Sequence, residues 1–212
     1  MEIMDRVLLC VMPFLPVERP ALGVSLLKSH LRARQIACDV RYFNHRFADE
    51  IGFKLYQQVA QLSPTHDLVG EWIFSKALNK TRARPDEEFA RLLRASSGFH
   101  YDEAVIGQIA YARSLAAPFI EQVADEIAGY RIVGFSSTFQ QNIASLALAQ
   151  ELKRRDPSLT IVFGGANCEG EMGIELHRCF PFIDIVCSGE ADETFPRVVE
   201  TVFSGESLVD IP

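Results

Sequence analysis

Thr160-Ile161-Val162-Phe163-Gly164-Gly165 is a short apolar run that ends in two consecutive glycines. A run of this length without polar alternation is typical of a strand buried on both faces of a parallel sheet. The same pattern recurs at Ile132–Phe135, which is followed directly by Ser136, Ser137 and Thr138. The sequence therefore predicts two buried parallel strands whose carboxyl ends carry small and polar residues.

Three further strands are predicted to extend this sheet, at Val7–Val11, Asp39–Phe43 and Ile183–Val186. Between the runs, apolar residues recur at helical spacing, which predicts helices that include Val24–Leu31, Phe119–Ile127, Ile143–Ala147 and Phe195–Val202. Pro20 is expected to open the first helix, because the first helical position needs no N–H. This alternation predicts an α/β fold: a Rossmann- or flavodoxin-like five-stranded parallel sheet, in the order 2-1-3-4-5, with helices on both faces.

The alternation stops between residues 45 and 114. This segment contains only helical pieces, such as Glu71–Leu78 with the single tryptophan of the chain, Trp72. A structureless loop of this length is improbable in a compact domain, so the segment is predicted to be a helical insertion or cap. Residues 1–44 and 115–205 then form the Rossmann-like domain, and residues 206–212 are expected to begin a linker.

The composition excludes several classes of partner. Lys+Arg 21 against Asp+Glu 28 gives a net charge of −7, which argues against nucleic acid or an anionic membrane. No stretch reaches the roughly 18 apolar residues of a membrane span, and the acidic N-terminus does not resemble a secretion signal. The five cysteines are scattered without C-x-x-C spacing, which predicts neither a zinc site nor a disulfide framework. A cytoplasmic protein with reduced thiols is expected.

Four loops are expected to meet where the strands end: 13–16, 136–141, 164–167 and 189–192. Loops 136–141 and 164–167 supply neutral hydrogen-bonding groups, none of the four loops contains Lys or Arg, and no phosphate-binding glycine motif is present. A large, weakly charged ligand is therefore favoured over a nucleotide. The alternative is purely structural: Gly164-Gly165 would be a tight turn, and Ser136, Ser137 or Thr138 would cap the next helix. No catalytic residue or metal-ligand pattern is evident.

Several motifs occur in order along the chain: Met12-Pro13-Phe14, Val133-Gly134-Phe135-Ser136, Phe163-Gly164-Gly165-Ala166-Asn167 and Gly189-Glu190-Ala191-Asp192. Together they resemble the N-terminal cobalamin (B12)-binding domain of cobalamin-dependent radical SAM enzymes. More narrowly, Gly70–Phe74 and Gly164–Gly170 resemble the radical SAM C-methyltransferases that mature ribosomally made peptides (RiPPs). The resemblance covers nearly the whole chain.

This resemblance implies that the chain binds cobalamin and positions methylcobalamin as a methyl carrier. Gly164, Gly165 and Asn167 would flank the nucleotide tail of cobalamin. The residues that would hydrogen-bond this tail are Ser136, Ser137, Thr138 and Gln140. Phe14 and Leu15 would lie near the corrin ring, and the remaining cofactor-binding candidates are Gly189 and Glu190. The motif Asp-x-His-x-x-Gly is absent, so a base-off cobalamin without a histidine ligand is expected, and no residue of this chain is expected to bind a metal.

The family's full-length enzymes also use a [4Fe–4S] cluster, S-adenosylmethionine and a precursor peptide. The Cys-x3-Cys-x2-Cys motif that holds the cluster is absent here. The chain is therefore expected to be a part of such an enzyme, without the catalytic barrel, and whether it is an enzyme alone stays open.

Two other functions compete with this interpretation. The first is a B12-like domain without cofactor that docks a peptide substrate or partner, through Trp72 and Phe74 with Arg82, Arg84, Arg91 and Arg94. The second is a flavodoxin-like signalling or nucleotide-binding domain, which would need phosphate-binding groups after the first strand. The proline-rich loop at 13–20 lacks such groups.

Overall fold

A computed structural model describes residues 5–79 and 85–208. Its centre is a five-stranded sheet with all strands parallel, in the order β2-β1-β3-β4-β5. The strands are β1 (Arg6–Val11), β2 (Ala37–Tyr42), β3 (Ile132–Ser136), β4 (Thr160–Gly164) and β5 (Ile185–Val186). The predicted Rossmann- or flavodoxin-like α/β fold and its strand order are therefore confirmed.

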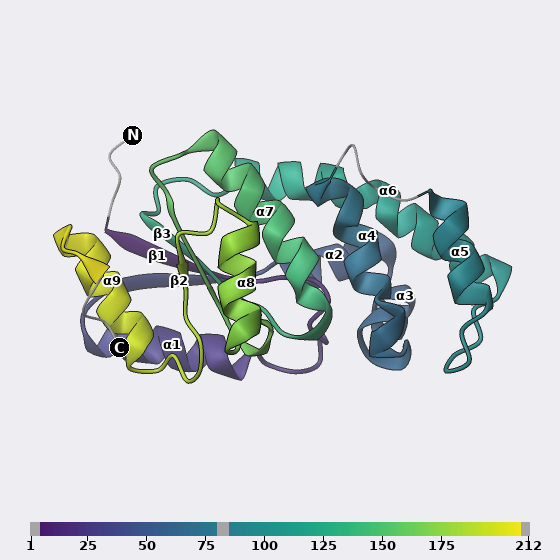
Figure 1. Ribbon diagram of the computed structural model, residues 1–212, viewed down its shortest axis with the longest axis horizontal. Helices are drawn as coiled ribbons and strands as arrows, with labels where there is room; N and C mark the ends of the chain where they lie inside the picture. Colours follow the sequence, from purple (N-terminus) through teal and green to yellow (C-terminus); the bar gives the residue numbers. More distant parts are fainter. Residues whose placement is uncertain (1–4, 80–84, 209–212) are drawn as a thin grey trace.

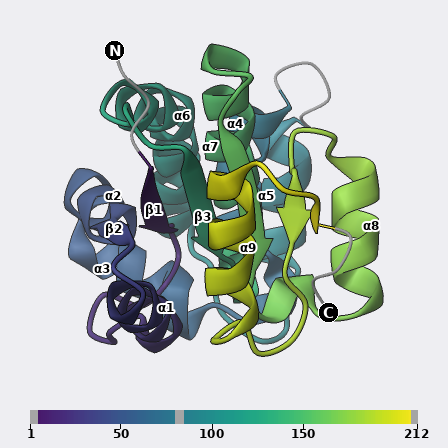
Figure 2. The ribbon, with the colours of Figure 1, turned by 90° about the vertical axis from the view of Figure 1, so that its left-hand side faces the viewer.

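Helices cover both faces of the sheet, as their apolar stripes require. Helix α1 (Leu22–Ala33) and α9 (Thr194–Ser204) pack on the face that contains Val7, Leu9 and Val162. Helix α6 (Glu103–Asp125) and α7 (Asn142–Arg155) pack on the face that contains Leu8 and Phe163. In Figure 2, α6 lies above β1 and α1 lies below it. Helix α8 (Glu171–Cys179) lies beside the edge strand β5.

The insertion is helical, and Figure 1 shows its helices grouped at the opposite end of the molecule from α9. It comprises α2 (Phe43–Ile51), α3 (Phe53–Gln57), the π-helical turn η1 (Gln58–Leu62), the 3₁₀ turn η2 (Thr65–Asp67), α4 (Val69–Leu78) and α5 (Asp86–Arg94). Its core joins that of the sheet through an aromatic cluster of Phe14, Phe47, Phe74 and Phe119. Helix α6 is continuous across the expected boundary at residue 114, so the insertion and the sheet share one helix.

Three local boundaries differ from the predictions. Helix α1 begins at Leu22 rather than at Pro20, and Phe43 begins α2 instead of ending β2 because its side chain is buried in the core shared with the insertion. Strand β5 is shorter than predicted. The Asp184 carboxylate accepts the N–H of Ile161, which replaces a backbone ladder bond at that position. Of the expected linker, residues 209–212 lie outside the described residues.

No helix in the described ranges is long and apolar enough to cross a membrane.

Candidate functional site

A narrow slot opens where β3 and β4 end, on the face of the sheet that α1 and α9 cover. Its volume is about 40 Å³. The lining is almost wholly apolar and includes Leu9, Leu27, Gly134, Phe195, Ser136, Gly164 and Gly165. Three of the residues that the sequence singled out, Ser136, Gly164 and Gly165, therefore lie together at one site.

Two glycines are required by the close approach of neighbouring atoms. A Cβ on Gly134 would come within 2.8 Å of Cδ2 of Leu9 and 3.6 Å of Phe195, so the absence of a side chain keeps the slot open. Gly165 has a φ of +90°, and a Cβ there would lie 2.7 Å from the backbone oxygen of Ser137. Gly165 therefore sets how closely the loop after β4 approaches the loop after β3.

Asn167 fixes the loop after β3 at the rim of the slot. Its Nδ2 donates to Ser137 Oγ (2.9 Å) and to the backbone oxygen of Phe139 (3.0 Å), and its N–H donates to the Ser137 oxygen (3.1 Å). Ser137 itself is fully buried. Ser137 and Asn167 are thus hydrogen-bonded to each other. They hold the loop after β3 in place, and the bonded groups are not free to bind a ligand.

Phe139 is an exposed residue of the loop after β3 that sequence reasoning missed. It lies in the 3₁₀ turn η3 (Phe139–Gln141), has a φ of +47° and is 79% exposed. A positive φ is unusual for a bulky residue and tends to occur where the surrounding structure enforces it. The only sequence signal was a phenylalanine within an otherwise polar loop, which predicts burial more readily than exposure.

The β1 end of the same edge is covered by the insertion. Phe14 is only 3% exposed and contacts the rings of Phe47, Tyr56 and Phe74. The backbone oxygen of Leu15, a half-buried residue, accepts from Asn44 Nδ2 and from the Tyr56 hydroxyl. Phe14 therefore joins the sheet to the insertion and does not face solvent.

Gln140 makes a second joint between the sheet edge and the insertion. Its Oε1 accepts the N–H of Gly70 (2.6 Å) and its Nε2 donates to the Val59 oxygen (3.2 Å). Gly70 is needed here, because a Cβ would lie 2.6 Å from Phe14 and 3.0 Å from Gln140. Gln140 is buried and its amide is occupied within the protein.

The helix after β3 is capped differently from the sequence prediction. The N–H and the hydroxyl of Thr138 both donate to Gln141 Oε1, which closes the short turn η3 rather than α7. The first N–H groups of α7 are instead bound by Glu71 of the insertion, whose carboxylate accepts from Asn142 (3.1 Å) and Ile143 (2.7 Å). Burial raises the pKa of Glu71 to about 7, although these two N–H bonds act in the opposite direction.

The last two candidates, Gly189 and Glu190, follow β5 and are exposed. Their neighbours Cys187 and Ala191 line the slot. Burial raises the pKa of the Cys187 thiol to about 11, so a neutral thiol faces the slot at physiological pH. Within the described residues, no cluster of three or more His, Cys, Asp or Glu side chains could hold a metal ion.

The residues suggested above for a peptide-docking surface differ in burial and in their contacts. Phe74 is fully buried and Trp72 is partly buried, stacked on Phe89 at a ring distance of 4.3 Å. Arg94 is bound by Glu87 and Glu103, whereas Arg91 is exposed. Arg82 and Arg84 lie outside the described residues.

Comparison of the chain with protein-family models, with curated proteins and with solved structures finds no match.

Proposed function

We propose that this chain is a cobalamin-binding domain that holds the nucleotide tail of cobalamin in the slot and the corrin ring over the ends of β3 and β4. The observation that carries the proposal is the slot itself. Gly134, Gly164 and Gly165 keep side chains out of a narrow apolar slot beside the sheet, and the slot opens at the carboxyl edge. In parallel α/β sheets, this edge is where ligands bind.

The chemistry of the donor set fits a large, weakly charged ligand. No charged side chain and no histidine lines the slot, which agrees with a base-off cofactor without a histidine ligand. The side chain of Ser136 offers a hydroxyl at the mouth, and the exposed ring of Phe139 offers apolar contact that excludes water from a macrocycle. A volume of about 40 Å³ holds only a few water molecules. Leu27 and Phe195 must therefore move aside to admit the tail.

When bound, cobalamin supplies a cobalt centre that carries a methyl group. The chain's own residues bind and orient the cofactor: the glycines admit its tail, Ser136 donates to it, and Phe139 shields its ring. Asn167 holds Phe139 in place through the backbone oxygen of that residue. The side chains of Phe14 and Gln140 connect this edge of the sheet to the insertion, through contacts with Phe74 and Gly70.

We further propose that the parent enzyme is a cytoplasmic radical SAM methyltransferase that C-methylates a ribosomally made peptide. In that enzyme, the [4Fe–4S] cluster and S-adenosylmethionine would be bound outside this chain. Support for this assignment comes from the motifs Gly70–Phe74 and Gly164–Gly170. Gly70 and Glu71 of the first motif join the insertion to the edge that carries the site.

Reconstitution with hydroxocobalamin, followed by desalting and a visible spectrum, tests the proposal. We expect the protein to retain the cofactor, and a colourless protein would overturn the assignment in favour of a domain without cofactor. Gly134→Ala places a methyl group in the slot and is expected to weaken binding at least tenfold, which corresponds to about 1.4 kcal/mol. Gly23→Ala on the surface of α1, where a Cβ meets nothing within 4 Å, is the matched control and should leave binding unchanged.

Phe139→Ala tests the rim separately from the slot. Loss of the exposed ring is expected to reduce cobalamin affinity by about tenfold through lost apolar contact. Its effect on the free energy of unfolding should be small, because the ring is 79% exposed in the free protein. Unchanged affinity would place the corrin ring away from this loop. Titration followed by the visible spectrum measures the affinity, and urea unfolding measures the stability.

A further inference from the structure

The insertion contains a second pocket, far from the slot and not used by the proposed function. Its volume is about 200 Å³, and it lies between α4, α5 and α6. We call it the α5–α6 pocket. Its floor is apolar and consists of Phe89, Leu93, Ile106 and Ile109, with Trp72 at one side. A volume of this size accommodates one or two large side chains.

Buried hydrogen-bond donors without acceptors lie beside this pocket. The side chain of Arg113 is only 2% exposed, and it follows Ile109 by one helical turn on α6. Its Nη1 donates to Ser75 Oγ and to the Trp72 oxygen, but its Nη2 has no hydrogen-bond partner. The indole Nε1 of Trp72 is also buried and unpartnered. Unsatisfied buried donors are costly, so an acceptor supplied by a ligand would stabilise this site.

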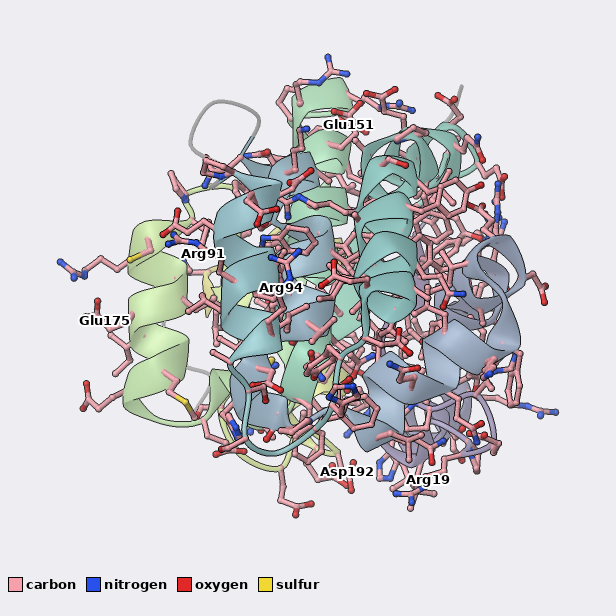
Figure 3. All side chains as sticks on the ribbon, turned by 90° about the vertical axis from the view of Figure 1, so that its right-hand side faces the viewer. Arg19, Arg91, Arg94, Glu151, Glu175 and Asp192 are labelled. Atoms are coloured by element: carbon pink, nitrogen blue, oxygen red, sulfur yellow. The ribbon has the colours of Figure 1, made fainter. Side chains whose placement is uncertain are left out.

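The mouth of the pocket is acidic. Asp86, Glu87 and Glu103 line it together with Arg94, and all three carboxylates are more than half exposed. Asp86 lies 3.1 Å from Arg113 Nε, while Arg94 is bound by both Glu87 and Glu103. Figure 3 shows Arg94 on the outer surface of the insertion, between α5 and α6. Three carboxylates against two arginines, Arg94 and the buried Arg113, leave a net negative charge that favours a cationic ligand over an anionic one.

We propose that the α5–α6 pocket binds a peptide segment in which an apolar side chain is flanked by basic residues. The apolar side chain fills the space above Phe89 and Leu93, and the basic residues face Glu87 and Glu103. For a backbone carbonyl of the peptide to reach Arg113 and Trp72, α5 would have to move outward, because both donors are covered in the free protein. This binding does not depend on cobalamin.

Trp72 is the only tryptophan of the chain, so its intrinsic fluorescence reports directly on the pocket. The probes are three synthetic peptides: acetyl-Lys-Leu-Lys-Leu-Lys-amide, its glutamate counterpart with the same leucines, and its glycine counterpart with the same lysines. We expect a saturable fluorescence change with the first peptide and at least tenfold weaker responses with the other two. The first response should weaken as salt is raised, because the charge contribution is screened.

Two glycine substitutions provide a matched test of location. Gly107 lines the pocket on α6, and Gly23 lies on α1; a Cβ at either position meets nothing within 4 Å. Gly107→Leu should fill the pocket and weaken peptide binding at least tenfold, whereas Gly23→Leu should change it less than twofold. Cobalamin retention should be unaffected by Gly107→Leu, which separates this proposal from the proposed function.

Three results would overturn the proposal. The first is the absence of a saturable response to the lysine–leucine peptide, and the second is an equal response to the glutamate peptide. The third is unchanged binding in the Gly107→Leu variant with the fold intact by circular dichroism. As a charge test, Glu87→Gln combined with Glu103→Gln should weaken the lysine–leucine peptide and reduce the dependence of its binding on salt.

Discussion

Glu71→Ala is expected to lower the free energy of unfolding by about 2–4 kcal/mol, because it leaves two N–H groups at the start of α7 without an acceptor. Helix α7 has no capping side chain of its own at this end. Its cap comes instead from α4, so the loss also removes a contact between the insertion and the helix after β3. Urea unfolding at pH 6 measures the change.

The matched control is Glu175→Ala. The Glu175 carboxylate makes only an exposed ion pair with Arg178 on the same helix, and Figure 3 shows Glu175 at the surface, away from the insertion. An exposed pair of this kind contributes less than about 1 kcal/mol. Equal losses in the two variants would contradict the capping role of Glu71.

Glu71 also gives stability a dependence on pH. Because burial raises the pKa of Glu71 to about 7 in the folded protein, its ordinary value of 4.5 applies only to the unfolded chain. The folded state therefore binds more protons between these values, and stability falls as pH rises from about 4.5 through 7. The contribution is fully present below pH 4.5 and amounts to about 3 kcal/mol.

Glu71→Gln tests this dependence, because glutamine does not titrate. The amide keeps one acceptor for α7 and should be less destabilising than alanine at pH 6. Its unfolding free energy should lack the decline between pH 5 and 8 that the unsubstituted protein shows. A decline of the same size in both proteins would assign it to another group.

Gly165→Ala is expected to cost about 3–5 kcal/mol of stability. Two effects combine: the backbone at φ +90° and ψ 179° is accessible almost only to glycine, and the new Cβ would lie 2.7 Å from the Ser137 backbone oxygen. Because the obstacle is backbone, it cannot rotate away as a side chain would. The thermal unfolding midpoint and urea unfolding both measure the loss.

Gly189→Ala separates these two effects. Gly189 also has a positive φ, +77°, but a Cβ there meets nothing within 4 Å. Its substitution should therefore cost only the conformational part, about 1–2 kcal/mol. If Gly165→Ala proved no more damaging than Gly189→Ala, the close approach of the two loops would not be a determinant of this edge.

The sheet could be predicted from sequence because each strand has a hydrophobic pattern within its own few residues. Ile132–Phe135 and Ile161–Phe163 are apolar on both faces, and each is followed by small or polar residues. The short β5 could not be predicted, since the Asp184 side chain takes over a backbone bond through a contact with β4. Local pattern thus determines the type of an element, while its length depends on distant partners.

The site was only partly accessible to the same reasoning. Gly164 and Gly165 were identified because paired glycines after a strand are a strong local signal. The burial of Phe14 depends on Phe47 and Tyr56, and the backbone oxygen of Phe139 is held by Asn167. These are long-range contacts that residue type and spacing do not reveal.

The strand order has a consequence for how the chain folds. Strand β1 ends at Val11 and its central neighbour β3 begins at Ile132, with the whole insertion between them. Closing so long a loop lowers the conformational entropy of the chain before the pairing of β1 with β3 can stabilise the fold. During synthesis, β1 emerges well before β3, so its apolar side chains lack this neighbouring strand until β3 has been made. We expect refolding to be slow and prone to aggregation, with the insertion helices forming first.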